Sequence, residues 1–339
     1  MNKNNNDNKY ILIGSAIYEN ELIEPTIGHI YLLEINNEFK INKISEITTN
    51  GGVYQILYND NIIYCSIQNN LYIYSIEKKF DFFEIKEIHK YTDFALINNM
   101  ELFNNNELLI SDLYKNIQLF KYDKKTDKLN EICKEYLLTW AFNITQCNNN
   151  IIYLTDINGN IISLIKTLYP KSNEEKYKFE KKAIFNFGER INKIINLKIS
   201  KNIIKNLENI TIFNKHNENE ENNNDNNFYG NLCYFGSLEG TLGIIIQLNK
   251  ELFEFLEQLQ NIIIKKLVPN GNFEYNRWRS YKDGFINEDH FGFVEGEILK
   301  EFLNYNDKEK KDILKELNYP WQKNIDDIVN IIQTLEKYH

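Results

Sequence analysis

Residues 151–164 read IIYLTDINGNIISL, two apolar runs on either side of a polar turn. Short runs rich in β-branched and aromatic residues, separated by Asp, Asn and Gly, predict two antiparallel strands joined by a tight turn. Gly and Asn suit such turns because they tolerate the positive φ angles that tight hairpins require. This stretch therefore predicts a β-hairpin.

The same pattern occurs four more times along the chain. The paired runs are 10–14 with 30–33, 62–65 with 71–74, 108–110 with 117–120, and 232–235 with 242–246. The residues just before the second runs are Gly28, Asn70, Asn116, Asn160 and Gly240, which lie 42, 46, 44 and 80 residues apart. The first three steps match the length of a four-stranded propeller blade. The last step indicates either one enlarged blade or two.

The hairpins predict a mainly β chain organised as a WD40-like β-propeller over residues 10–248, with about five to six blades. Residues 1–9 are expected to be disordered, as is an Asn- and Glu-rich insertion at 214–227 that has no apolar residue to bury. Five hairpins are few for a closed ring. Either another blade is hidden in less regular sequence, or the chain is the end of a longer architecture.

The pattern changes to a helical one after Leu248, which predicts a small helical C-terminal domain over residues 249–339. Asn249 is a suitable N-cap for the first helix. Its apolar stripe recurs at helical spacing: Leu252, Phe255, Leu256, Leu259, Ile262, Ile263 and Leu267. The stretch Pro269-Asn270-Gly271 should end that helix. Three further helices are expected over 295–303, 307–317 and 324–338.

Composition limits the classes of partner. The net charge is −9, with 39 Lys and Arg against 48 Asp and Glu, so the basic footprint of a tight nucleic-acid binder is missing. No apolar run reaches the length of a membrane span, and the N-terminus lacks a signal core, so we expect a soluble, intracellular protein without membrane association. Four widely spaced cysteines are expected to act as small apolar residues in a reducing compartment.

Motifs for catalysis or cofactor binding are not found, and we expect no enzyme activity, no cofactor and no metal. The sequence contains neither a phosphate-binding glycine loop nor a zinc-binding His-Glu-x-x-His motif, and its five histidines are scattered. Asp112 and Asp156 stand at equivalent positions of neighbouring hairpins. A catalytic carboxylate pair is one interpretation, but acids that bond backbone groups in turns are much commoner.

Two motifs in the tail resemble a known family. They are Arg277-Trp278-Arg279-Ser280-Tyr281 and the segment 292–298, GFVEGEI. The chain resembles the last third of the large damaged-DNA-binding proteins, whose superfamily includes the large cleavage-and-polyadenylation factor subunit and a splicing-factor subunit. The likeness continues upstream, for example at Phe187-Gly188-Glu189 and Phe235-Gly236-Ser237. It implies most of a third propeller followed by the helical C-terminal domain.

The resemblance implies a non-enzymatic adaptor of a cullin–RING ubiquitin ligase that presents WD-repeat substrate receptors and takes part in DNA damage recognition and nucleotide-excision repair. In that family an amphipathic helix of the receptor inserts between the first and third propellers, and the cullin docks on the second. DNA is contacted mainly through a partner subunit, and the expected location is nuclear and also cytoplasmic. The sibling branch implies an alternative function, a scaffold for pre-mRNA cleavage and polyadenylation or splicing.

The resemblance also implies a receptor-binding surface on the third propeller. Its positions here are Thr92, Phe94, Lys115, Lys134, Trp140, Asn192 and Leu238. The apolar members suit an amphipathic helix. Lys115 and Lys134 stand where the family tends to place Arg, which would weaken planar two-pronged recognition. Trp140 could instead be a packing residue of the core. Trp278 and Trp321 are expected to tie the helical tail to the propeller.

Overall fold

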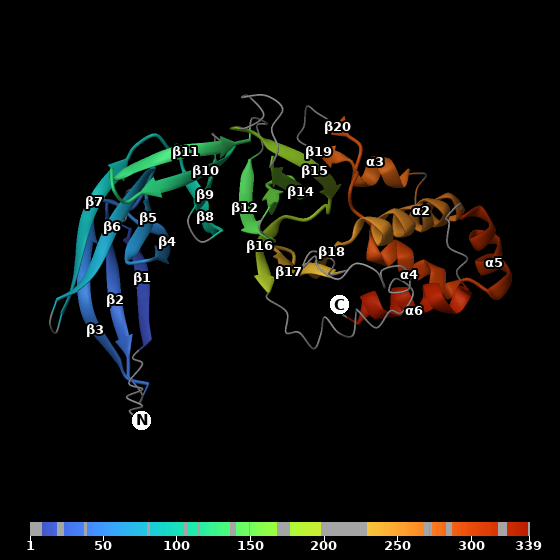
Figure 1. Ribbon diagram of the computed structural model, residues 1–339, viewed down its shortest axis with the longest axis horizontal. Coiled ribbons are helices and arrows are strands. Elements are labelled where there is room, and N and C mark those ends of the chain that lie inside the picture. Colours follow the sequence, from blue (N-terminus) through green and yellow to red (C-terminus); the bar gives the residue numbers. More distant parts are fainter. Residues whose placement is uncertain are drawn as a thin grey trace, which may run out of the picture. The chain divides into compact units, whose positions relative to one another are not determined.

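The structure, a computed structural model, describes most of the chain. The described residues are 9–18, 24–36, 39–79, 82–104, 107–113, 116–135, 140–148, 150–167, 177–197, 229–267, 271, 273–282, 287–317 and 324–337. Within them the strands form five larger antiparallel sheets and a short two-stranded one, and helices follow (Figure 1). The fold is that of β-propeller blades followed by a helical C-terminal part, as the hairpin repeat predicts. Residues 1–8 and the predicted insertion at 214–227 lie outside the described residues.

The chain divides into two compact units, the first made of residues 1–144 and 166–180, the second of residues 145–165 and 181–339. The first unit contains three sheets, in which strands that follow one another in the chain pair antiparallel. Their strands are β1 (Lys9–Ile17), β2 (Ile27–Ile35) and β3 (Ile41–Thr49); β4 (Val53–Asn59), β5 (Ile62–Ile67), β6 (Asn70–Lys79) and β7 (Phe82–Tyr91); and β8 (Ile97–Phe103), β9 (Glu107–Asp112), β10 (Asn116–Asp123) and β11 (Lys128–Lys134).

The fourth and fifth sheets complete the β part. Their strands are β12 (Ala141–Gln146), which begins in the first unit, β13 (Ile151–Asp156), β14 (Asn160–Lys166) and β15 (Phe179–Asn186); and β16 (Ile191–Leu197), β17 (Tyr229–Ser237) and β18 (Leu242–Leu248). All five predicted hairpins are confirmed as antiparallel pairs. Because β16 pairs with β17, the long insertion lies between two strands of one sheet, which settles the open alternative in favour of one enlarged blade.

The sheet β4–β7 shows why the repeat folds as it does. On one of its faces Ile63 and Cys65 are completely buried, in a cluster with Ile30 of the first sheet. On the opposite face Leu71 and Ile73 are equally buried, in a cluster with residues of the third sheet. A sheet that is apolar on both faces is stable only between two neighbours. Stacking of successive sheets is therefore dictated by the sequence of each one.

The two equivalent aspartates bond backbone groups. Asp156 accepts hydrogen bonds from the backbone N–H groups of Asn158 and Asn160, both at 2.9 Å, in the turn between β13 and β14. Asp112 accepts from the backbone N–H of Ala95 at 2.8 Å and thereby holds the loop before β8. Both carboxylates are buried. Asp156 thus agrees with the turn interpretation, whereas Asp112 bonds the backbone of a distant loop.

The helical part consists of α2 (Lys250–Lys266), α3 (Tyr275–Arg279), α4 (Gly296–Asn304), α5 (Asp307–Glu316) and α6 (Ile325–Glu336). The four longer helices confirm the predicted ones to within two residues at each end. Asn249 caps α2 as expected, its side-chain oxygen accepting the backbone N–H of Leu252 at 2.8 Å. Apolar periodicity did not predict α3 or the short strands β19 (Tyr281–Lys282) and β20 (Asn287–Glu288), because each is too short to show a period.

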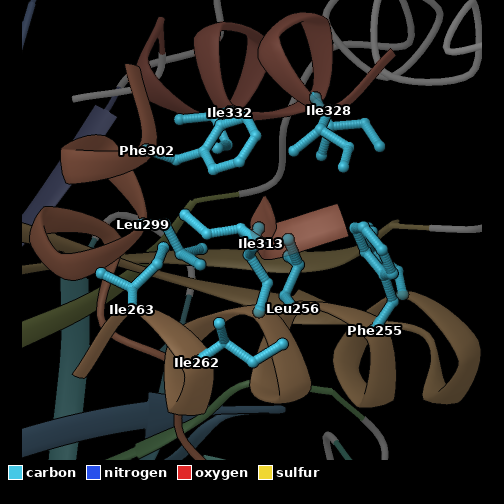
Figure 2. Close-up of a cluster of buried hydrophobic side chains, with 12 residues drawn as sticks. Phe255, Leu256, Ile262, Ile263, Leu299, Phe302, Ile313, Ile328 and Ile332 are labelled. Atoms are coloured by element: carbon cyan, nitrogen blue, oxygen red, sulfur yellow. The ribbon is translucent and has the colours of Figure 1, made fainter. Parts of the chain in front are cut away.

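The four longer helices bury their own core. Side chains from α2, α4, α5 and α6 point toward one another in Figure 2, among them Leu256, Leu299, Phe302, Ile313 and Ile332. They carry no polar atoms and are almost completely excluded from water. Burial of this many large side chains, each contributing about 1.5–3 kcal/mol, stabilises the bundle. The helices therefore form an apolar cluster separate from those of the sheets.

A buried arginine connects this bundle to the fourth sheet. Arg279, at the end of α3, forms a forked ion pair with Glu295, with Nε donating to Oε2 at 3.0 Å. Its Nη1 donates to the carbonyl oxygens of Asn186 and Phe187, at 3.2 and 3.1 Å, at the end of β15. The guanidinium lies 3.6 Å from the centre of the Trp278 ring. The guanidinium therefore contacts a carboxylate, two carbonyl oxygens and an aromatic ring. Trp321, the other tryptophan expected to tie the tail to the propeller, lies outside the described residues.

A buried amide makes a second connection between tail and sheet. Asn160, in the turn of the fourth sheet, donates to Asp156 at 2.6 Å and to the carbonyl oxygen of Lys282 at 2.7 Å, and accepts the backbone N–H of Lys282 at 3.1 Å. Farther along, Ile184 of β15 and Phe291 exchange backbone hydrogen bonds at 2.8 and 3.0 Å. The RWRSY segment is therefore built into the edge of the sheet.

Arg279→Ala is predicted to lower the free energy of unfolding by about 3–5 kcal/mol, because Glu295 would be left as a buried carboxylate without its cation. Urea unfolding of the full chain measures the loss. Lys300→Ala is the matched control, since it breaks the exposed pair between Lys300 and Glu336 in the same unit and should change stability little. Equal effects of the two substitutions would contradict the structural role of Arg279.

His290 is predicted to make the fold weaker in mild acid. Burial lowers the pKa of its imidazole, more than the nearby Asp289 and Glu295 raise it, and Arg279 adds to the lowering. As the pH falls through the ordinary value of 6.5, the unfolded chain takes up a proton that the folded chain resists, so stability is lost. Denaturant unfolding at pH 7.5 and 5.5 should show a smaller loss for His290→Gln. The exposed His89, changed to Gln, should leave the loss unchanged.

Candidate partner-binding surface

In the first unit, amide side chains align the first strands of successive sheets. Gln55 of β4 donates to the carbonyl oxygen of Asn98 on β8 and accepts the backbone N–H of Met100, both at 2.6 Å. Asn98 in turn donates to the carbonyl oxygen of Ala141, the first residue of β12, at 3.0 Å. Because each amide bonds the backbone of the next first strand, the beginnings of β4, β8 and β12 are held side by side.

Three aromatic side chains are exposed at this aligned edge. Tyr54, Trp140 and Phe142 leave 42%, 52% and 39% of their surfaces accessible. The residues next to them in the strands, Val53 and Ala141, are buried. We call Tyr54, Asn98, Trp140 and Phe142 the rim. Clustered aromatic side chains on a rigid framework are typical anchors of protein–protein interfaces.

The rim is mainly neutral and able to donate hydrogen bonds. Partial burial raises the pKa of the Tyr54 phenol, and the neighbouring Tyr18 and Glu24 raise it further, so its O–H stays protonated at physiological pH. Trp140 carries an indole N–H, and Asn98 an amide. An apolar helix face with a few polar groups would suit this surface.

Thr92 and Phe94, both predicted contacts, lie in the loop that leads into β8. Thr92 is exposed beyond the end of β7. Phe94 is buried, and its ring packs edge-on against Phe120 with 5.8 Å between ring centres. The bond from Ala95 to Asp112 holds the loop in this position. Phe94 therefore packs in the core beneath the loop and does not lie on the protein surface, contrary to the prediction.

Two further predicted contacts, Lys134 and Trp140, are among the described residues. Lys134 ends β11, is partly exposed and lies 3.5 Å from the carboxylate of Glu131. Lys115 lies outside the described residues. Trp140 is more than half exposed, which favours the interpretation as a surface anchor over a packing role in the core.

Asn192 and Leu238 belong to the second unit, where the structure brings them together. Asn192 is the exposed second residue of β16, and Leu238 is an exposed residue in the turn after β17. Ile191 pairs with Ser237, and the backbone N–H of Leu238 donates to Arg190 at 2.9 Å. The two side chains therefore occupy the same end of the fifth sheet, the end that corresponds to the rim in the sheets of the first unit.

The resemblance did not indicate Tyr54 or Phe142. A signal exists in the sequence: both are the second residue of a first strand, directly after a buried apolar residue. An aromatic side chain at that place lies on the other face of the sheet from the buried residue before it, because neighbouring residues of a strand face opposite sides. The sequence shows this signal only once the first strand of each sheet has been located.

Cysteine chemistry, metal binding and membrane crossing are three further properties of the described residues that bear on function. The four cysteines are buried and none forms a disulfide; burial raises the pKa of Cys133 to about 12, so its thiol is protonated. Within the described ranges no three His, Cys, Asp or Glu side chains converge as metal ligands would. Among the described helices, none combines the length and apolar character needed to cross a membrane.

Comparison with known proteins places these observations in a family. Residues 1–304 match the model of the family described as the CPSF A subunit region. The chain is 21% identical over 338 residues to DNA damage-binding protein 1 of Oryza sativa subsp. japonica, and 21% and 22% identical over 337 residues to DNA damage-binding proteins 1a and 1b of Arabidopsis thaliana. Each match covers 98% of this chain but 28% of the relative.

The family match and the fold agree. Sheets of the blade type followed by a helical part extend over the matched residues, and the matched range includes both the rim and the RWRSY segment. The chain therefore belongs to the CPSF A subunit region family and corresponds to part of a protein like DNA damage-binding protein 1.

Proposed function

We propose that this chain is part of a non-enzymatic scaffold that presents substrate receptors to a cullin–RING ubiquitin ligase, in DNA damage recognition and nucleotide-excision repair. The names of the matched relatives support a role in handling DNA damage. The chain spans 28% of the length of these relatives, so the ligase role concerns a larger assembly in which this part supplies one binding surface.

The observation that carries the proposal is the exposure of Trp140, Tyr54 and Phe142 on first strands that amide bonds hold in line. A rigid aromatic surface binds a partner without much loss of conformational entropy. The partner proposed for it is a WD-repeat receptor that offers the apolar side of an amphipathic helix. Thr92, in the loop before β8, and Lys134, at the end of β11, would contact the polar side of the same helix.

The chain's charge fits a scaffold that reaches DNA through another subunit. A net charge of −9 opposes direct binding to phosphates. In this proposal the receptor contacts the DNA, and the cullin binds propellers that are not among the residues of this chain. The expected place of action is the nucleus, and also the cytoplasm.

A second candidate function is a scaffold in pre-mRNA cleavage and polyadenylation or in splicing. The description of the matched family, CPSF A subunit region, favours it. The same sheets could serve either assembly because a fold does not determine its partners. The identity of the captured partner distinguishes the two functions.

Trp140→Ala is predicted to weaken receptor binding by about 2 kcal/mol or more, because an interface aromatic is lost. Folding should be unaffected, since most of the side chain already lies in water. Tagged chain, wild type or variant, is incubated with nuclear extract from cultured Arabidopsis thaliana cells, and bound proteins are identified by mass spectrometry. WD-repeat proteins, with or without a cullin, should bind the wild type and be depleted from the variant.

Phe39→Ala is the matched control. Phe39 is 87% exposed in the turn between β2 and β3, at the opposite end of its sheet from the turn between β1 and β2. It should not change the captured proteins. Capture of cleavage, polyadenylation or splicing factors alone would contradict the ligase proposal and support the second function. Unfolding of Trp140→Ala in a circular dichroism melt would assign Trp140 to packing instead.

A further inference from the structure

Two of the four cysteines meet in the buried cluster between the fourth and fifth sheets. Cys147 follows the end of β12, and Cys233 lies in β17. Both belong to one apolar cluster and are 1% and 0% exposed. Their thiols are hydrogen-bonded to each other. The pair is therefore a dithiol made of residues that are far apart in the sequence, and both lie within the second unit.

Backbone contacts bring the same two residues together independently of the thiols. Asn196 of β16 pairs directly with Cys233, so the two side chains lie on the same face of the fifth sheet. The Asn196 amide donates to the carbonyl oxygen of Cys147 at 2.6 Å. The next residue, Asn148, donates to the Gln247 side chain of β18 at 2.8 Å. The face of the fifth sheet that carries Cys233 is thus held against the end of β12.

The chemical setting of Cys147 differs from that of Cys65 and Cys133. Burial raises the pKa of those two thiols, as is usual in apolar surroundings. In Cys147 the hydrogen bond with the Cys233 thiol lowers the pKa more than burial raises it, and the Tyr153 phenol adds to the lowering. The thiolate is the reactive form of cysteine. Cys147 is therefore better prepared to react than the two isolated cysteines, and a second thiol lies beside it.

A small oxidant needs only a short path to this thiol. Cys147 is followed by Asn148 and Asn150, both partly exposed, between β12 and β13. Its backbone N–H donates to the carbonyl oxygen of Ile151 at 2.8 Å within this connection. Local opening of a surface connection costs less free energy than global unfolding. Hydrogen peroxide, which is little larger than water, reaches the sulfur by such an opening.

We propose that Cys147 and Cys233 are a redox site at which hydrogen peroxide forms a reversible disulfide between the fourth and fifth sheets. The Cys147 thiolate attacks one peroxide oxygen, the O–O bond breaks, and a sulfenic acid forms while the released hydroxide becomes water. The Cys233 sulfur then attacks the sulfenic sulfur, the S–O bond breaks, and the leaving hydroxide takes the proton of the Cys233 thiol. Two thiols thus lose two electrons, and one peroxide is reduced to two molecules of water.

The disulfide would join the end of β12 to β17, the middle strand of the fifth sheet. A disulfide needs its sulfur atoms about 2 Å apart, and hydrogen-bonded thiols reach this separation by a small side-chain rotation. Because the residues between the two cysteines become a closed loop, the oxidised chain should unfold at a higher urea concentration than the reduced chain. The site does not depend on the ubiquitin-ligase role, because it uses buried residues of the second unit and none of the rim.

Peptide mapping by mass spectrometry tests the proposal on the full chain. The reduced chain is treated with hydrogen peroxide, free thiols are alkylated in denaturant, and the chain is digested without reductant. Peptides joined through Cys147 and Cys233 should appear, and dithiothreitol should separate them. Cys65 and Cys133 should be recovered alkylated. Failure to form the joined peptides, or oxidation of Cys65 and Cys133 as fast as that of Cys147, would overturn the proposal.

Substitutions separate the two steps of the reaction. In Cys233→Ser, peroxide should leave Cys147 as a sulfenic acid that dimedone labels. Tyr153→Phe keeps the ring, removes the phenol and should slow disulfide formation several-fold. Cys133→Ser, at a buried cysteine of the first unit, is the matched control and should form the disulfide like the wild type. A circular dichroism melt verifies folding; if Cys233→Ser unfolds, Cys233→Ala replaces it. Dimedone labelling no greater at Cys147 than at Cys65 would contradict a reactive Cys147.

Discussion

Sheets that are apolar on both faces impose one constraint on this chain: each must be covered on both sides. In β4–β7 one face buries Ile63 and the other buries Leu71, both completely. Neither face can be left in water without losing about 25 cal/mol for each Å² exposed. The stacking of sheets, the alignment of their first strands and the position of the exposed rim all follow from this requirement.

The helical part meets a different requirement. Its apolar side chains pack mainly against one another (Figure 2), and buried polar groups add contacts with the fourth sheet. Arg279 and Asn160 each make several of those contacts. Buried polar groups bond only in one arrangement, since an unsatisfied one is costly. Apolar burial thus builds the parts, and a few buried polar groups fix how tail and fourth sheet meet.

Much of this could be predicted from the sequence because periodicity reports local structure. The five hairpins, the Asn249 cap and the four longer helices were all predicted from the spacing of apolar and polar residues. The strands that flank the hairpins were not predicted one by one, and α3 is too short to show a period. Phe94 shows a limit of a different kind. Whether a loop aromatic points inward depends on a distant carboxylate, Asp112, which no local pattern reveals.

The candidate surface was predictable only in part for the same reason. Trp140 could be named from a resemblance, but the strands that carry Tyr54 and Phe142 are aligned only by side-chain bonds between sheets, from Gln55 to Asn98 and from Asn98 to Ala141. The most direct measurement is hydrogen–deuterium exchange of the full chain with and without a bound WD-repeat receptor. The account predicts slower exchange at residues 53–55, 97–98 and 140–144. Protection confined to the helices α4–α6, with the rim unchanged, would contradict it.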